Sequence, residues 1–269
     1  FMTEKSFQTN IAADPAPGNQ KWKRPLFLAL SGLVFLIHIL PFLFSDLWYD
    51  EIITLTDFVA PAAGKDSILY VFQTYPVDNN HVLFSAASAL WVRLTGFQDE
   101  FILRVPSVIC GLLLLAWIAY RWSHWIGRRT ATLTAVMFAS SPVFGAFAYQ
   151  FRGYALTLLL ACILVTASIE LVRRPMWHSY AAAAVASVLL LLTIPTNGLY
   201  VLAHSVFVFI APSNKRSLRT RLKTTAPLLA GLIAGCAYYL SIWERFTQAI
   251  GKVDGWDSGV AVFGNVLLG

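Results

Sequence analysis

Seven long apolar stretches constrain the fold of this chain more than any other feature of its sequence. They run near residues 25–44, 102–121, 130–148, 153–172, 179–193, 198–212 and 225–243. A helix needs about 20 apolar residues to cross roughly 30 Å of hydrocarbon. The stretches are rich in Leu and Ala, and none alternates with the period of two of a membrane barrel strand. The sequence therefore predicts an all-α polytopic membrane protein of about seven transmembrane helices, the fifth and sixth of them short.

Composition supports a membrane protein and excludes several other classes. Of the 269 residues 57% are hydrophobic and only 13% are charged, whereas soluble domains carry about 25% charged residues. Cys110, Cys162 and Cys236 each fall inside a predicted span, where a small thiol behaves as a hydrophobe. We therefore expect neither a disulfide nor a metal cluster.

The polar ends of the chain suggest a simple domain organisation. Residues 1–24 are expected to form a disordered cytoplasmic tail. Residues 25–243 are expected to form one transmembrane module, with a long first outer loop over residues 45–101. Residues 244–269 are expected to be an outer-side segment that looks incomplete.

The basic residues are distributed unevenly, and this predicts the orientation. With the N-terminus inside, most of the 20 Lys and Arg lie in the tail and near residues 121–129, 173–174 and 215–223, while most of the 14 Asp and Glu lie outside. Such an excess of Lys and Arg is typical of cytoplasmic loops. We therefore expect a cytoplasmic N-terminus in a membrane of the bacterial inner-membrane type. Anionic membrane lipids then explain the net charge of +6, without nucleic acid as a partner.

The first outer loop is expected to be helical itself. Residues 47–60 and 67–75 could form short helices, and residues 82–97 a strongly apolar one. That helix is too short to span comfortably, and Trp91 suits a helix lying in the membrane interface. As an eighth span it would place the later basic clusters outside, so we expect the interfacial arrangement.

Two neighbouring carboxylates, Asp50 and Glu51, follow the first apolar stretch. Adjacent carboxylates at a membrane boundary repel each other and lose hydration, so this pair is a candidate general base. The alternative is that both are solvated charges at the start of the first loop helix, whose N-terminal dipole favours them.

Three further polar residues are expected on the same outer side. Arg104 and Arg152 stand at the outer ends of two predicted spans, against the positive-inside bias. They suggest a bound anion, because a guanidinium fork fits phosphate oxygens. His81 could donate to a phosphate or a sugar hydroxyl, or be an ordinary residue at a helix start. For the arginines, the alternative is a salt bridge to Asp50, Glu51, Asp99 or Glu100.

Several short motifs then resemble those of a known family. The segment Leu47-Trp48-Tyr49-Asp50-Glu51 resembles the first-loop acidic motif of membrane GT-C glycosyltransferases. Residues 80–84, residues 100–107 and the segment Arg152-Gly153-Tyr154-Ala155-Leu156 are similar to the protein O-mannosyltransferase and aminoarabinose transferase branch. The resemblance covers about residues 25–210, with the motifs in the family's order.

The resemblance implies transfer of a sugar from a polyprenyl-phosphate donor to an acceptor hydroxyl on the non-cytoplasmic face, with inversion at the anomeric carbon. Asp50 would act as the general base and Glu51 would support it. Arg104 or Arg152 would hold the leaving phosphate, which needs no strong acid. Tyr154 and Trp48 could pack on the sugar or the prenyl chain. The acceptor could be a glycan, a lipid or a protein.

Two departures from the family pattern shape the remaining expectations. Many relatives carry an acidic residue just before the Arg-x-Tyr segment, where this chain has Tyr149-Gln150-Phe151. No cofactor is therefore predicted, and a divalent metal is not supported. Family enzymes usually continue with further helices, so a partner chain or a missing C-terminal part is expected to complete the enzyme.

Two other functions remain as alternatives. The first is a non-catalytic subunit that binds polyprenyl phosphate or assists assembly in a cell-envelope glycan system. The second is a transporter, which should show charged residues in mid-membrane or paired broken helices in two related halves. The sequence shows no such repeat.

Overall fold

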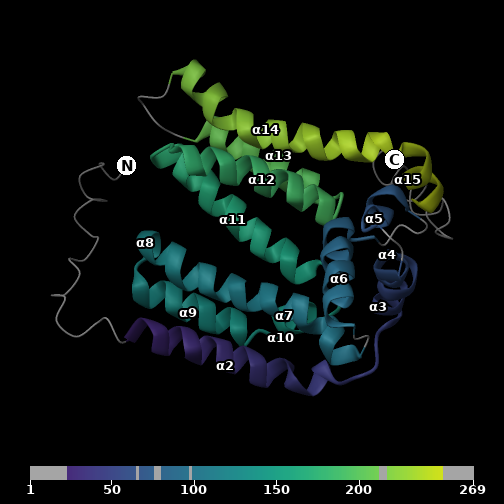
Figure 1. Ribbon diagram of the computed structural model, residues 1–269. Coiled ribbons are helices and arrows are strands. Elements are labelled where there is room, and N and C mark those ends of the chain that lie inside the picture. The colour runs from purple at the N-terminus through teal and green to yellow at the C-terminus, as the bar shows by residue number, and fades with distance from the viewer. Residues whose placement is uncertain (1–22, 65–66, 76–79, 97–98, 212–216, 251–269) are drawn as a thin grey trace, which may run out of the picture.

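The structure is a computed structural model that describes residues 23–64, 67–75, 80–96, 99–211 and 217–250, with side chains from Leu28 onward. These residues form helices joined by short turns, and no strand occurs among them (Figure 1). The predicted all-α class is confirmed. The predicted tail and most of the segment 244–269 lie outside the described residues.

Each predicted apolar stretch is helical, but not all of these helices are long enough to cross a membrane. By length and apolar composition, three described helices qualify, namely Glu100–Ile126, Tyr154–Arg173 and Leu218–Ser241. A bent pair of helices adds a fourth candidate. The chain is thus an integral membrane protein, while the predicted number of seven spans is not confirmed. In chain order the helices of the stretches are α2 (Lys23–Leu43), α7 (Glu100–Trp117), α9 (Arg128–Ala139), α10 (Pro142–Tyr149), α11 (Tyr154–Arg173), α12 (Trp177–Thr193), α13 (Asn197–Ile210) and α14 (Leu218–Ser241).

The third predicted stretch is broken rather than continuous. Between α9 and α10 the helix axis bends by 67°. Pro142 is the cause, because proline lacks an N–H and its ring clashes with the preceding turn of a continuing helix. Ser141 caps the new helix, since its hydroxyl accepts a hydrogen bond from the Phe144 amide at 3.3 Å.

The first loop is helical, as predicted. It contains α3 (Tyr49–Ile53), the π-helix η1 (Thr54–Val59), α4 (Ala60–Gly64), α5 (Leu69–Gln73) and α6 (Val82–Thr95). With 14 residues α6 is too short to count as a span. It ends at Gly96, whose φ of 68° lies in the left-handed region that glycine adopts without strain.

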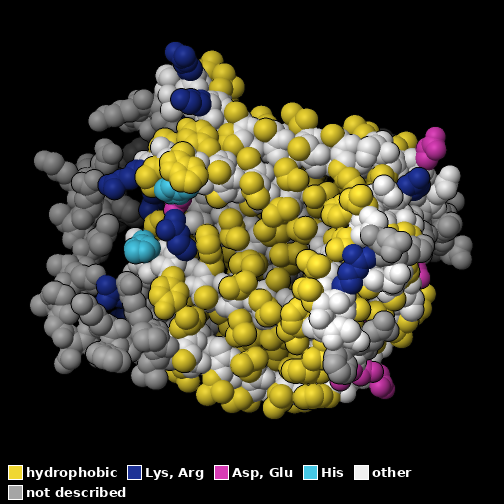
Figure 2. Space-filling model, in the orientation of Figure 1, with side chains coloured by type: hydrophobic (Ala, Val, Ile, Leu, Met, Phe, Trp, Pro, Cys, Tyr) yellow, Lys and Arg dark blue, Asp and Glu magenta, His cyan; other side chains and the backbone are white. Residues whose placement is uncertain are grey.

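The helices run between two ends of different charge. Figure 1 shows α3 to α6 and α15 (Trp243–Ile250) at one end, which we call the acidic end. The opposite end holds α8 (Ser123–Ile126) and the start of α12, and we call it the basic end. Figure 2 shows a broad band of hydrophobic side chains between them, with most Lys, Arg and His at the basic end. Such an apolar band with polar ends suits a bilayer.

Candidate active site

The short helix α3 places its two carboxylates in opposite environments. The Asp50 side chain is 52% exposed, whereas that of Glu51 is 1% exposed. Successive residues of a helix point about 100° apart, so one of the two faces outward and the other faces the protein interior. The Glu51 side chain also caps the start of α3, because its Oε2 accepts a hydrogen bond from the Trp48 amide at 2.9 Å. The predicted pair is therefore divided into one accessible and one buried carboxylate.

Glu51 and Arg104 form a fully buried, bidentate salt bridge. Arg104 Nε lies 3.1 Å from Glu51 Oε1, and Arg104 Nη2 lies 2.8 Å from Glu51 Oε2. Neither side chain is more than 1% exposed. Two parallel charge-assisted hydrogen bonds offset the cost of removing both charges from water. The salt bridge to Glu51, one of the alternatives given for Arg104 from the sequence, is present.

The other N–H groups of Arg104 donate hydrogen bonds to backbone carbonyls at the C-terminal end of α2. Its Nη1 donates to the carbonyls of Phe42, Leu43 and Ser45 at 2.8, 3.1 and 2.7 Å. Its Nη2 also donates to the Asp46 carbonyl at 3.1 Å. The last carbonyls of a helix lack partners within the helix, so this guanidinium satisfies them. These contacts give Arg104 a structural role that joins α2, α3 and α7.

Arg152 contacts Asp50, and a hydrogen bond from the residue before it to Glu51 fixes its position. The Phe151 amide donates to Glu51 Oε1 at 2.5 Å, which fixes the segment before Arg152. Arg152 is 1% exposed, and its Nη1 donates to the Asp50 carbonyl at 3.1 Å and lies 3.6 Å from Asp50 Oδ2. The structure thus brings the accessible carboxylate and a buried guanidinium together, from segments about a hundred residues apart.

The His81 imidazole lies beside Arg152, and each of its ring nitrogens lies within hydrogen-bond distance of a nitrogen atom. The Gly153 amide donates to Nδ1 at 2.9 Å, and Arg152 Nη2 lies 3.0 Å from Nε2. His81 precedes α6, outside the candidate spans. Burial, and then the positive charge of Arg152, lower the pKa of His81 from 6.5 to about 3. The ring is therefore neutral at pH 7, and the positive charge of the site comes from Arg152.

Aromatic rings enclose this cluster. The Arg152 guanidinium carbon lies 5.5 Å from the centre of the Tyr154 ring, and the His81 ring meets Tyr154 edge-on at 5.0 Å. Trp48 is 59% exposed at the start of α3. Of the seven residues predicted for the site, Arg104 and Glu51 form its buried support. Asp50, Arg152, His81 and Tyr154 are linked by contacts, and Trp48 lies at its surface.

Sequence reasoning missed two residues of this cluster. A Cβ at Gly153 would lie 2.6 Å from His81 Nδ1 and 2.8 Å from Thr193 Cγ2, so only glycine fits there. Tyr149 packs its ring 5.5 Å from the Arg104 guanidinium carbon. The glycine within the Arg152-Gly153-Tyr154 segment was a visible signal of a close approach, whereas nothing in the sequence distinguishes Tyr149 from other buried aromatic residues.

Metal-ligating side chains do not gather in the part of the chain that the structure describes. No group of three His, Cys, Asp or Glu side chains there could hold a metal ion.

Fold and site together define an integral membrane protein that carries an accessible carboxylate above a buried arginine at one end of its helices. A family model described as dolichyl-phosphate-mannose-protein mannosyltransferase matches residues 81–241. The chain belongs to this family, which has a GT-C type domain, and the resemblance noted in the sequence is confirmed. Membership supports a glycosyltransferase function of the GT-C type.

The matched residues include His81, Arg104, Arg152 and Tyr154, whereas Asp50 and the rest of α3 precede them. No curated protein and no solved structure matches the chain.

Proposed function

We propose that this chain transfers a sugar from a polyprenyl-phosphate donor to an acceptor hydroxyl on the non-cytoplasmic face, with Asp50 as general base. The observation that carries the proposal is the half-exposed Asp50 carboxylate, held 3.6 Å from the buried Arg152 guanidinium in a chain of a glycosyltransferase family. The carboxylate is open to an acceptor. The guanidinium is suited to an anionic leaving group.

The reaction proposed for this arrangement needs one proton acceptor and one anion-binding group. Asp50 takes the proton of the acceptor hydroxyl as its oxygen attacks the anomeric carbon of the donor sugar. The bond from that carbon to the phosphate oxygen breaks, and its electron pair remains on the phosphate. Arg152 stabilises the charge that develops there. Attack opposite the leaving group inverts the anomeric configuration.

In this proposal Glu51 keeps the supporting role that the resemblance implied, whereas Arg104 supports the structure and leaves the phosphate to Arg152. Because each satisfies the other inside the protein, we assign them to positioning. Glu51 is the neighbour of Asp50 in the chain and accepts from the amide next to Arg152. It thereby sets the separation of the base from the guanidinium, while Arg104 neutralises its buried charge.

Substitution of Asp50 by Asn tests the proposed base. In purified protein supplied with polyprenyl-phosphate sugars and acceptor, Asp50→Asn should lower turnover by about a hundredfold or more, since general bases contribute roughly 10²–10⁴. Donor binding should be retained. The matched control is Asp57→Asn, which removes another first-loop carboxylate and should leave turnover near the wild-type value. Unchanged turnover in Asp50→Asn would exclude this residue as the base.

A second candidate function is a non-catalytic subunit that binds polyprenyl phosphate. It is favoured by the burial of Glu51, which leaves one carboxylate of the pair at the surface. This function predicts donor binding by the wild-type chain without transfer. Binding should then survive Asp50→Asn and weaken in Arg152→Gln.

A further inference from the structure

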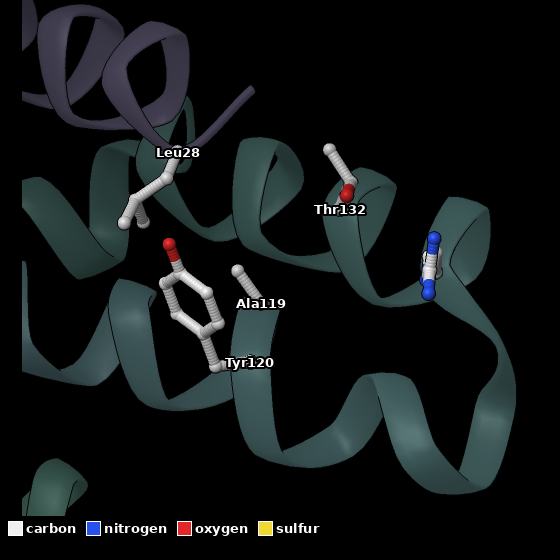
Figure 3. Close-up of a pocket in the computed structure, with 5 residues that line it drawn as sticks. Leu28, Ala119, Tyr120 and Thr132 are labelled. Atoms are coloured by element: carbon white, nitrogen blue, oxygen red, sulfur yellow. The ribbon is translucent and has the colours of Figure 1, made fainter. Parts of the chain in front are cut away.

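A cavity at the basic end lies far along the helices from the proposed active site. It lies between α2, α9 and the π-helix η2 (Ile118–Trp122), which continues α7. Leu28 comes from α2, Ala119 and Tyr120 from η2, and Arg128 and Thr132 from α9. In Figure 3 the Tyr120 hydroxyl points toward Leu28, so a phenol projects into the space between the helices.

The lining of this cavity combines one cation, two hydroxyls and an apolar wall. The Arg128 guanidinium supplies N–H donors and a positive charge, and Tyr120 and Thr132 each supply a hydroxyl. Leu28 and Ala119 supply the apolar part. An anionic oxygen attached to an apolar body matches both halves of this lining, whereas a free inorganic anion matches only the polar half.

The helix geometry is irregular at the same place. The π-helix η2 interrupts the apolar helix that runs from Glu100 to Ile126. Single π turns inside α-helices are rare, and they occur frequently at functional sites. Tyr120 lies in the middle of this π segment and is 42% exposed. The distortion therefore places a polar ring at the cavity, next to the surface of the helix bundle.

We propose that this cavity binds the phosphate of an anionic phospholipid of the surrounding bilayer. Basic pockets between membrane helices are suited to lipid headgroups, and an arginine near the membrane surface is attracted by the negative charge of an anionic leaflet. Arg128 and the Tyr120 hydroxyl donate to the phosphate oxygens. The acyl chains extend over the exposed apolar side chains nearby, of which Leu133 is 63% exposed.

Thermal unfolding in nanodiscs of defined composition tests the proposal. Phosphatidylglycerol added to phosphatidylcholine should raise the Tm of the wild-type chain, because a ligand that binds only the folded state stabilises it. Arg128→Gln should lose most of that rise, and Tyr120→Phe part of it. Arg129→Gln is the matched control, because it removes the neighbouring charge of α9, which does not line the cavity, and should keep the rise.

Three outcomes would overturn the proposal. The first is a wild-type Tm that does not respond to phosphatidylglycerol. The second is an equal loss of the rise in Arg128→Gln and Arg129→Gln, which would indicate diffuse surface charge. The third is an equal rise on adding inorganic phosphate to phosphatidylcholine nanodiscs, which would indicate a free anion. Because Tyr120→Phe removes a single oxygen, it keeps the test decisive where Arg128→Gln fails to fold.

Discussion

At the scale of single residues, the buried pair of Glu51 and Arg104 is the strongest determinant of the site. Arg104→Met should destabilise the chain by about 3–5 kcal/mol, because it leaves an uncompensated buried carboxylate. Thermal or denaturant unfolding in detergent measures the loss. Arg93→Met is a suitable control, since its guanidinium bonds carbonyls of α4 at the more exposed surface of α6.

The double variant Glu51→Leu with Arg104→Met separates charge from packing. If the buried charge causes the loss, the double variant should be more stable than Arg104→Met alone. Equal stability of the two variants would show instead that the lost contacts of Arg104 with the end of α2 dominate.

The lowered pKa of His81 should make the stability of the folded chain depend on pH. This pKa is about 3 in the folded chain and 6.5 in the unfolded chain, so the unfolded state binds more protons between these values. Stability should therefore fall as the pH falls below 6.5, by on the order of 2 kcal/mol at pH 5. In His81→Gln this part of the pH dependence should disappear, as measured by unfolding at pH 7 and pH 5.

The exposed His124 provides the control for that measurement. His124→Gln keeps the buried imidazole of His81, so it should lose stability between pH 7 and pH 5 as the wild type does. A wild-type slope that persists in His81→Gln would assign the dependence to other groups.

At the scale of secondary-structure elements, close packing of α14 on α12 depends on two glycines. A Cβ at Gly231 would lie 2.5 Å from the Ala184 carbonyl oxygen and 2.5 Å from Ser187 Cβ. At Gly235 the nearest atom is Leu191 Cδ2 at 2.6 Å. Small residues four apart allow membrane helices to approach closely. Leu191 Cβ would also lie 2.7 Å from the new methyl group at Gly235, and rotation of the leucine side chain cannot move that atom, so both glycines face atoms fixed by the backbone.

We therefore expect Gly231→Ala and Gly235→Ala each to destabilise the chain by about 1–3 kcal/mol. Unfolding in detergent compares the two variants. Gly198→Ala in α13 is the control. The new Cβ would lie 3.6 Å from the nearest atom, so this substitution should be tolerated. A loss in either variant no larger than that in Gly198→Ala would contradict the argument from close packing.

The sequence predicted the elements better than their contacts. Runs of about 20 apolar residues specify helices locally, so α7 and α11 were predicted within a few residues of their ends, whereas α14 begins at Leu218, well before the predicted start at residue 225. The pair Ser141-Pro142 was a local signal for the break before Pro142, but hydropathy averaged over the whole stretch does not show it. The pairing of Glu51 with Arg104 has no local signal, because 53 residues separate them and several carboxylates compete for the same arginine.

At the scale of the whole molecule, the number of helices that cross the bilayer depends on two short helices, α12 and α13. With 17 and 14 residues, α12 and α13 extend about 26 and 21 Å, less than the roughly 30 Å of hydrocarbon. Both pack on α11 and α14, which are long enough to cross. A short helix held between long ones can cross where the bilayer thins beside it.

Cysteine labelling at the turn between α12 and α13 decides this question. Thr196 is exposed in that turn. With the three native cysteines replaced by Ala, an impermeant maleimide should label Thr196→Cys from the same side as Ser67→Cys at the acidic end. His124→Cys at the basic end should react only from the opposite side. If Thr196→Cys reacts together with His124→Cys, α12 and α13 form a hairpin that does not cross, and the chain has two spans fewer than its sequence predicts.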